Sequence, residues 1–395
     1  MVNVIAGLII ALVLGLLMIR RAPNAKWMII VLMTIIIGGG VATLYLKNGS
    51  ALFVQPLKEQ RIAYISAQDG RSDLWTMRLD GSDKVRLTND SAEDRSPSWS
   101  SDGSEIVSIS DRIAKKYQIL VTGWDGRYSK LVTATDGIKD SPRFVGNTRT
   151  IVYMSNGRIF TVPSSGGEEE QILPPHESTM STQGTSPFVH AAFSSNAEYL
   201  VCVQRTDANN GVVVMETPNG QLPSNAQDIK TITQVGGKEL YSAWSPVKPL
   251  LCVSGAGLEG GNLNALATLN LETMENKNIY ATKGDSTAPG QFEFSPDGSK
   301  IAFELWKVSD GVLAKCTGVY VVSSDGGKPV CLIAGDARRP SWSGDGKYVV
   351  CTKADDNGKR DIWRINADGS NPVNLTKGQG DNYDAACSPM PKSKQ

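Results

Sequence analysis

The chain has 395 residues, 41% of them hydrophobic, and its 40 Lys and Arg residues balance its 40 Asp and Glu residues. This length exceeds one ordinary small domain but suits a single closed all-β array, and the lack of basic excess argues against nucleic-acid binding. Only two histidines occur, His176 and His190, which excludes most histidine-based metal and acid–base sites.

Two uncharged apolar runs, residues 4–19 and 27–46, begin the chain. A helix needs about 17–25 such residues to cross the hydrocarbon core of a bilayer, so these runs predict a transmembrane helical hairpin over residues 1–46. A cleaved signal peptide is the alternative. The hairpin is favoured because the start carries no positive charge and arginines stand where a small-residue cleavage site belongs.

The loop between the two runs carries Arg20, Arg21 and Lys26. Basic loops stay on the cytoplasmic side, so we expect the cytoplasmic (inner) membrane, with everything after residue 46 on its periplasmic or extracellular side. Small residues let helices approach closely, either against each other or against another membrane subunit. The candidates for such helix packing are Gly7, Ala11, Gly15, Gly38, Gly39 and Gly40.

After a linker over residues 47–60, the chain repeats itself to its end. The clearest copies are SPSWSSDGSEIVSIS (96–110), QFEFSPDGSKIAFEL (291–305) and RPSWSGDGKYVVCTK (339–353). Each copy has one anchor position, and the anchors lie 45 to 51 residues apart. They are Trp99, Phe144, Phe193, Trp244, Phe294, Trp342 and Cys387. A period of about 40–50 residues with several short strands is typical of β-propellers.

The chemistry within one repeat predicts four strands. The anchor ends a short strand, and a Ser-x-Asp-Gly turn and an apolar strand follow. A third strand, such as residues 74–79, ends in an Asp-Gly hairpin turn, and a short fourth strand, such as residues 85–88, completes the blade.

The segments LWTMRLDGSDKVRLTNDSAEDRSPSWSSDG and IWRINADGSNPVNLT resemble the repeats of TolB-type (WD-repeat-like) propellers. Those repeats are similar in turn to the propellers attached to prolyl oligopeptidases. The resemblance covers about residues 61–389 and implies the propeller fold. TolB itself is a soluble periplasmic protein with six blades and a separate α/β domain. This chain departs from it in its apparent seven blades and its apolar N-terminal segment.

The ends of the repeat region complement each other. The last copy stops after its first strand, at 385–388, and the strand at 61–66 has no such partner before it. Joining the two gives a 1+3 closing blade, which removes exposed sheet edges. The sequence therefore predicts an all-β, seven-bladed β-propeller over residues 61–395, preceded by two transmembrane helices.

We expect partners to bind the face that carries the long connections, since binding sites commonly lie on loops held by a rigid scaffold. These connections are residues 110–117, 173–190, 204–211, 254–264 and 305–317. Residues just before each innermost strand are expected at the mouth of the central channel, and Trp306 lies in a long connection. The predicted partner-binding residues are Arg95, Asp140, His190, Tyr241, Gln291, Trp306, Arg338, Arg339, Tyr383 and Asp384. A solvated rim without a ligand is the alternative.

No catalytic, metal-binding or cofactor-binding residues are predicted. The chain has no Gly-x-Ser-x-Gly elbow, and His176 beside Glu177 is best explained as a loop pair. The Asp-rich stretches 66–73 and 353–361 fit Asp-capped turns better than calcium loops. Cysteines in apolar strands are expected as buried free thiols, whereas Cys316 and Cys331 flank one hairpin and are candidates for a disulfide in an oxidising compartment.

The favoured function is a non-enzymatic one: a membrane-anchored scaffold or accessory subunit with protein partners that include membrane subunits. The alternatives are a receptor for glycan or peptide ligands at the channel mouth, and a propeller hydrolase or lyase with an unrecognised site.

Overall fold

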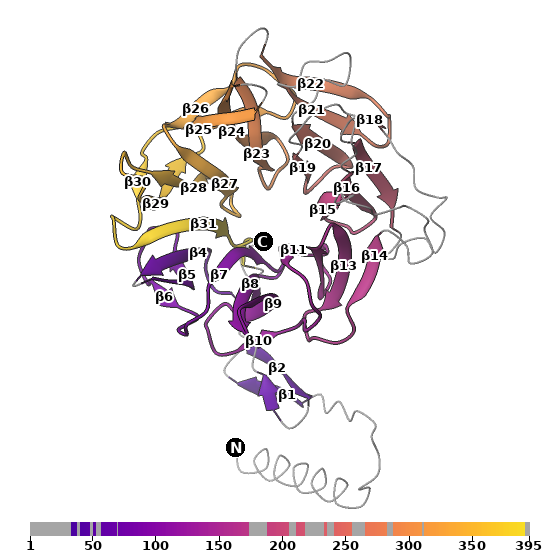
Figure 1. Cartoon of the computed structure of the whole chain (residues 1–395), viewed down its shortest axis with the longest axis vertical. Coiled ribbons are helices and arrows are strands. Elements are labelled where there is room, and N and C mark those ends of the chain that lie inside the picture. The colour runs from indigo at the N-terminus through magenta and orange to yellow at the C-terminus, as the bar shows by residue number, and fades with distance from the viewer. Residues whose placement is uncertain are drawn as a thin grey trace, which may run out of the picture. The chain divides into compact units, whose positions relative to one another are not determined.

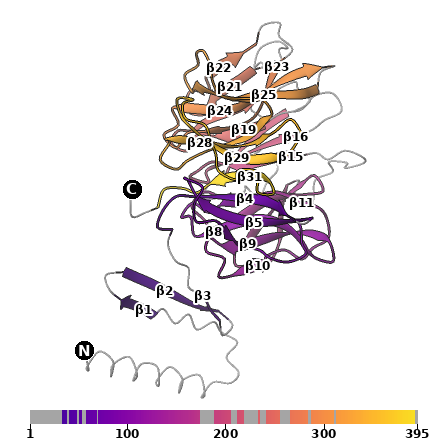
Figure 2. The ribbon, with the colours of Figure 1, turned by 90° about the vertical axis from the view of Figure 1, so that its left-hand side faces the viewer.

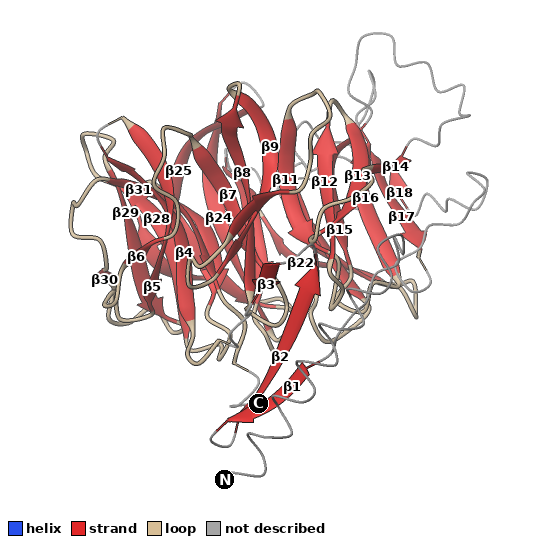
Figure 3. Cartoon of the chain, turned by 90° about the horizontal axis from the view of Figure 1, so that it is seen from below, coloured by secondary structure: helices blue, strands red, loops and turns tan. Residues whose placement is uncertain are grey.

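The computed structural model describes residues 33–37, 40–47, 50–52, 57–68, 70–173, 188–204, 211–217, 233–234, 241–254, 265–282, 287–309 and 312–391. The chain forms two compact units, Met1–Gln55 and Pro56–Gln395. Every regular element within the described residues is a strand (Figure 3).

The first unit contains a small antiparallel sheet of β1 (Met33–Ile37), β2 (Gly40–Lys47) and β3 (Ser50–Leu52). The sequence predicts a helix over 27–46, and this is wrong for the residues of β1 and β2. Strand β1 contains one threonine and three isoleucines, and β2 contains one valine, one threonine and one tyrosine. Branched and aromatic side chains of this kind favour extended backbone. Each of the neighbouring glycines would cost a helix about 1 kcal/mol.

Gly40, expected to pack a helix, is instead the first residue of β2. The first predicted span, with Gly7, Ala11 and Gly15, lies outside the described residues, as do Gly38 and Gly39. Within the described part of the chain, no helix has the length and apolarity needed to cross a bilayer.

The second unit is a ring of seven four-stranded blades (Figure 1). In each blade the strands run outward from the axis in an antiparallel meander, as the repeat predicts. Blade 2 holds β7 (Asp94–Trp99), β8 (Glu105–Ile113), β9 (Lys116–Gly123) and β10 (Ser129–Leu131). Blade 3 holds β11 (Lys139–Phe144), β12 (Thr150–Ser155), β13 (Arg158–Pro163) and β14 (Glu170–Leu173). Blade 4 holds β15 (Phe188–Phe193), β16 (Tyr199–Gln204), β17 (Gly211–Glu216) and β18 (Thr233–Gln234).

The remaining blades follow the same order. Blade 5 holds β19 (Tyr241–Trp244), β20 (Leu250–Ser254), β21 (Ala265–Asn270) and β22 (Asn276–Ala281). Blade 6 holds β23 (Thr287–Phe294), β24 (Lys300–Ser309), β25 (Val312–Ser323) and β26 (Val330–Ala334). Blade 7 holds β27 (Ala337–Trp342), β28 (Tyr348–Ala354), β29 (Arg360–Asn366) and β30 (Val373–Asn374).

Blade 1 closes the ring with strands from both ends of the repeat region, which confirms the 1+3 prediction. The order is β31 (Asp381–Cys387), β4 (Arg61–Gln68), β5 (Arg71–Arg78) and β6 (Val85–Arg86), with β31 innermost. In Figure 1 the yellow β31 lies beside the indigo β4.

The core is divided into seven apolar clusters, one at each seam between neighbouring blades. Figure 2 shows the ring from its side, with β4 and β5 of blade 1 next to β8 and β9 of blade 2. Strand β16 shows why its sequence is a continuous apolar run. Leu200 and Cys202 pack toward blade 3, whereas Val201 and Val203 pack toward blade 5. A strand between two blades buries both of its faces, so apolar residues do not alternate with polar ones.

All seven anchors end an innermost strand, as predicted, and the tryptophans among them join neighbouring blades. Trp99 Nε1 donates a hydrogen bond of 3.0 Å to the carbonyl of Ala386 in the preceding blade. Trp244 Nε1 bonds to the Ala192 carbonyl at 2.9 Å, and Trp342 Nε1 to the Glu293 carbonyl at 3.1 Å. Each acceptor is the residue just before the anchor of the preceding blade. The anchor thus fixes the spacing of the innermost strands.

Two of the predicted long connections are paired strands instead. Strands β8 and β9 are separated only by Ala114 and Lys115, and β24 extends to Ser309. Trp306 therefore lies on a strand, not in a loop. Residues 174–187, 205–210 and 255–264, from the other three connections, lie outside the described residues.

Candidate binding site on the ring axis

The innermost strands share a local irregularity near the axis. A bulge interrupts the pairing with the second strand between Arg95 and Ser98, and again between Arg338 and Ser341. Equivalent bulges occur in blades 1, 3, 4 and 6. Ser96, Ser141, Arg339 and Asp384 take positive φ angles of 51–55° at these bulges. Three of the four precede a proline, a residue that normally holds its predecessor in extended backbone.

The bulges bring two rings of residues to the innermost edge of the blades. The upper ring, three positions before each anchor, is Ser96, Ser141, His190, Tyr241, Gln291, Arg339 and Asp384. The lower ring, one position before each anchor, is Ser98, Arg143, Ala192, Ala243, Glu293, Ser341 and Ala386. Most members of both rings are partly exposed, whereas Pro97, Pro142 and Pro340 between them are buried. Solvent therefore reaches the axis at both levels.

Carboxylates of one blade hold the backbone of the next. Asp384 Oδ2 accepts a hydrogen bond of 3.2 Å from Ser96 N, and its Oδ1 lies 2.8 Å from Arg339 Nη1. Glu304 on β24 accepts hydrogen bonds from Arg339 N at 2.7 Å and from Gln291 N at 3.4 Å. Several residues predicted as partner contacts therefore already hold blades 6, 7, 1 and 2 together.

Sequence reasoning missed the two charged members of the lower ring, Arg143 and Glu293. They break a ring of otherwise small residues. A signal was present, because both stand directly before an anchor, where the other blades carry serine or alanine.

The charges on the axis influence one another. Burial and the nearby Arg143 lower the pKa of His190 to about 4, so the imidazole is neutral at neutral pH. His190 Nε2 lies 3.0 Å from the Ser242 carbonyl of the next blade. Burial raises the pKa of Glu293 to about 7, against a hydrogen bond from Trp342 N and the attraction of Arg143. The strands around the axis also remove much of the solvent near the Arg143 guanidinium and lower its pKa, although the side chain itself remains accessible.

Three arginine–aromatic pairs lie on the face of the β8–β9 and β24–β25 hairpins, called here the hairpin face. The Arg95 guanidinium is 3.9 Å from the centre of the Tyr117 ring, and Arg338 is 4.6 Å from that of Trp306. Arg360 is 4.0 Å from the Tyr383 ring. Trp306 also donates to Glu304 at 2.7 Å. Such contacts fix side chains that are otherwise mobile.

The remaining predicted residues are placed as follows. Asp140 is exposed, and its Oδ1 accepts a hydrogen bond of 2.8 Å from Ser141 N. Tyr241 begins β19 and is half-buried. Tyr383 donates a hydrogen bond of 3.0 Å to, or accepts one from, the hydroxyl of Ser72.

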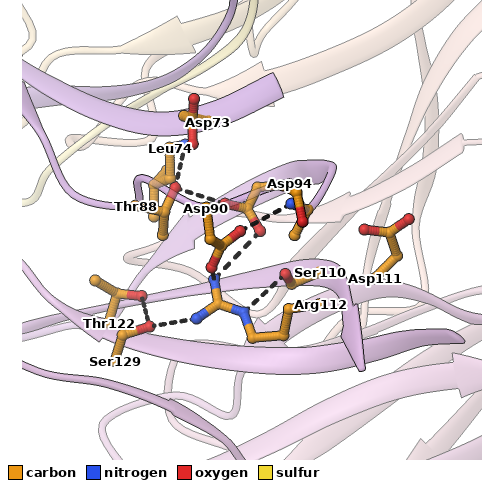
Figure 4. Close-up of polar contacts among 12 residues, drawn as sticks. Asp73, Leu74, Thr88, Asp90, Asp94, Ser110, Asp111, Arg112, Thr122 and Ser129 are labelled. Atoms are coloured by element: carbon orange, nitrogen blue, oxygen red, sulfur yellow. Dashed lines mark hydrogen bonds and ion pairs between the residues drawn. The ribbon is translucent and has the colours of Figure 1, made fainter. Parts of the chain in front are cut away.

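A second polar cluster lies where blades 1 and 2 meet (Figure 4). The Arg112 guanidinium lies 3.6 Å from both Asp90 and Asp94, and Thr88 donates to Asp94 at 2.6 Å. Thr88 in turn accepts a hydrogen bond from Leu74 N. Within the described residues, no group of His, Cys, Asp or Glu is arranged to hold a metal ion. The positive charge beside these carboxylates comes from Arg112. The contacts of Thr88 with Leu74 and Asp94 join β5 of blade 1 to β7 of blade 2.

The Asp-rich stretches behave as capped turns. Asp355 Oδ1 accepts hydrogen bonds of 2.9 Å from Asn357 N and from Lys359 N. Cys316 and Cys331, the candidates for a disulfide in an oxidising compartment, are both free. Cys331 pairs with Tyr320 across the strands, which places it four residues, or roughly 13 Å, along the strand from Cys316.

A cleft of about 370 Å³ lies between two short turns of blades 6 and 7, away from the hairpin face. Asp297 and Asp345 in its wall accept hydrogen bonds from the serines of their own turns. These carboxylates are already used to form the turns.

Comparison with known proteins agrees with this architecture. The family model of the TolB beta propeller domain matches residues 47–248, just over half of the chain. The Tol-Pal system protein TolB of Desulfosudis oleivorans is 29% identical over 112 residues, which are 27% of this chain and 25% of that protein. The chain thus spans about a quarter of the length of that curated relative.

Solved structures show the same fold at low identity. TolB from Acinetobacter baumannii aligns with a TM-score of 0.51 and 17% identity, covering 84% of this chain and 67% of that one. Oligogalacturonate lyase from Vibrio parahaemolyticus aligns with a TM-score of 0.53 and 11% identity, covering 80% and 84%. At such identities the likeness shows the fold alone.

Proposed function

Because the chain belongs to the TolB β-propeller family, we propose that it works as a protein-interaction module that binds its partner on the hairpin face. The observation that carries this proposal is the set of arginine–aromatic pairs on that face, Arg95 with Tyr117 and Arg338 with Trp306. Tryptophan, tyrosine and arginine dominate the binding energy of protein interfaces. Side chains already held in place lose little conformational entropy when a partner binds.

The kind of partner is suggested by the relatives. The curated relative is named as a protein of the Tol-Pal system, so a protein assembly of that kind is the favoured setting. We propose an accessory or scaffold role in such an assembly, with membrane subunits among the partners.

Membrane anchoring is part of the proposal and rests on the sequence. Residues 4–19, the first predicted span, carry no Asp, Glu, Lys or Arg, and a segment of this composition favours a bilayer over water. We propose that residues 1–46 hold the propeller at the cytoplasmic membrane, on its periplasmic or extracellular side. Extraction of membranes at alkaline pH tests this, since an anchored chain stays in the pellet and a peripheral one is released.

A second candidate function is that of a polysaccharide lyase, because the fold of oligogalacturonate lyase aligns with most of this chain. The family and the polar contacts on the axis favour binding over catalysis. Depolymerisation of an acidic polysaccharide by the purified chain would reverse that order.

The test of the interaction module is capture in mild detergent, compared between matched variants. The variant R338E reverses a charge of the hairpin face, where Arg338 pairs with Asp336. The control R127E reverses an exposed charge that pairs with Asp125 in the β9–β10 turn, at the opposite ends of the strands. We expect a stoichiometric partner to be lost from R338E and kept by R127E. Equal capture by both variants would place the interface elsewhere, and a solitary wild-type chain would contradict the role as a subunit.

A further inference from the structure

Arg143 differs from the other charged residues on the axis. It is exposed although it lies on an innermost strand, and the described residues give it no hydrogen-bond or ion-pair partner. By contrast, Arg339 pairs with Asp384 at 2.8 Å, and Glu293 Oε1 accepts a hydrogen bond of 3.3 Å from Trp342 N.

The neighbouring polar groups on the axis form hydrogen bonds between blades, whereas Arg143 forms none with the described residues. His190 bonds to the next blade, and Ser341 Oγ accepts a hydrogen bond of 3.1 Å from Cys387 N. Blades 3 and 4, where Arg143 lies, meet through an apolar cluster that includes Val145, Met154 and Leu200. The packing of the seam therefore does not require an arginine at position 143.

The surroundings leave positive charge on the axis at neutral pH. The His190 imidazole is neutral because its pKa is about 4. Glu293 is partly protonated because burial brings its pKa to about 7. Arg339 is compensated by Asp384, whereas Arg143 is attracted only by the partly protonated Glu293, so its positive charge is incompletely balanced.

We propose that Arg143 forms a carboxylate-binding subsite on the ring axis, which takes an acidic side chain of a bound polypeptide. The proposal rests on the interaction module proposed above and names the chemistry it recognises on the axis. A guanidinium presents two parallel N–H donors that match the two oxygens of a carboxylate.

A carboxylate fits this site better than a phosphate group. Arg143 supplies one positive charge, which balances a carboxylate monoanion but leaves the second charge of a phosphate dianion uncompensated, and an uncompensated charge in a confined site is costly. Replacement of Glu293 by glutamine removes one competitor for Arg143, so the proposal predicts tighter binding in that variant.

The experiment measures binding of short peptides to the full chain in mild detergent by calorimetry. The probes are the capped pentapeptides Gly-Gly-Glu-Gly-Gly and Gly-Gly-Gln-Gly-Gly, with succinate, its neutral diamide and inorganic phosphate as further arms. We expect the Glu peptide to bind about 10- to 100-fold more tightly than the Gln peptide, as a charged hydrogen-bonded pair provides. In R143Q this preference disappears, in E293Q it grows, and in R158Q it is unchanged.

Each outcome has a definite meaning. A Glu preference that R143Q abolishes supports the subsite, and R158Q excludes a general loss of charge as its cause. Binding of succinate without the peptide would assign the site to small free carboxylates and overturn a polypeptide ligand. Equal binding of Glu and Gln peptides, a preference that survives R143Q, or tighter binding of phosphate would overturn the proposal. If the partner is still captured in that case, only the subsite fails and the interaction module stands.

Discussion

Arg61 and Ser388, which lie 327 residues apart in the sequence, are joined by two hydrogen bonds. Arg61 N donates to Ser388 Oγ at 2.9 Å, and Ser388 N donates to the Arg61 carbonyl at 2.8 Å. The bonds continue the pairing of β31 with β4 beyond the end of the ladder, so they lie at the point where the ring closes.

The variant S388A tests the strength of this closure. It leaves the buried Arg61 N without its acceptor, which should lower the free energy of unfolding by about 1–2 kcal/mol. Urea denaturation of the purified chain measures the change. The control is S370A, whose exposed hydroxyl bonds only to the surface side chains of Asp368 and Asn366. Its loss should cost less than about 0.5 kcal/mol. Equal losses in the two variants would mean that the ring does not depend on this contact.

Tryptophan at an anchor position should stabilise the ring through its indole N–H. The variant W99F keeps an aromatic ring but loses the bond to the Ala386 carbonyl, so we expect a loss of about 1–2 kcal/mol. Trp75 offers a matched control because its buried Nε1 has no hydrogen-bond partner within the described residues. W75F should therefore be neutral or slightly stabilising, and a larger loss in W75F than in W99F would contradict this reading.

The sequence was sufficient to predict the repeat architecture. Anchors such as Trp99 and Trp342 recur every 45 to 51 residues, and each is the last residue of an innermost strand, directly before a turn. The closing blade followed because the strand at 61–66 lacked an inner partner. Arg143 and Glu293 were missed although both replace a small residue directly before an anchor, because the influence of one charge on the other across the axis depends on the closed ring. The helix predicted over 27–46 is not found at residues 33–37 and 40–46, because apolar character alone does not distinguish a membrane helix from β-branched strands.

Glycine should be required at position 318 for two reasons: a Cβ would not fit there, and the backbone takes a positive φ angle. Its φ is +147°, and a Cβ there would lie 2.3 Å from the Ile333 carbonyl oxygen. Gly327, in the same blade, has a φ of +129° but no heavy atom within 4 Å of the added carbon. We expect G318A to lose about 3 kcal/mol or more and G327A about 1–2 kcal/mol, measured by urea denaturation. Similar losses would show that the close approach of Ile333 is relieved elsewhere.

Stability should depend on pH through Glu293. Its pKa rises from an ordinary value of 4.5 to about 7 in the folded chain. A carboxyl group with a raised folded pKa contributes stability that is present below about pH 4.5 and is lost as pH rises through about 7.

The variant E293Q removes this dependence. It should match the wild type near pH 4.5 and exceed it above pH 7, by roughly 3 kcal/mol at most. His190 acts in the opposite direction, because its pKa is lowered to about 4 and its contribution is lost as pH falls from 6.5. The informative quantity is therefore the difference between E293Q and the wild type at each pH. A difference that does not grow between pH 5 and 8 would refute the assignment.

The six cysteines should differ sharply in reactivity. Cys331 is exposed, whereas Cys202, Cys252, Cys316 and Cys351 are buried and Cys387 is half-buried. Burial raises the pKa of the Cys202, Cys316 and Cys351 thiols to about 12, and it raises that of Cys252 and Cys387 as well. The thiolate is the reactive form, so a thiol whose pKa is raised and which solvent cannot reach reacts slowly. In the native chain we expect a chromogenic disulfide reagent to label one thiol rapidly, and six in urea. C331S should abolish the rapid phase and C202S should leave it unchanged. A rapid phase that survives C331S would show that one of the strands holding the other thiols opens readily in the native state.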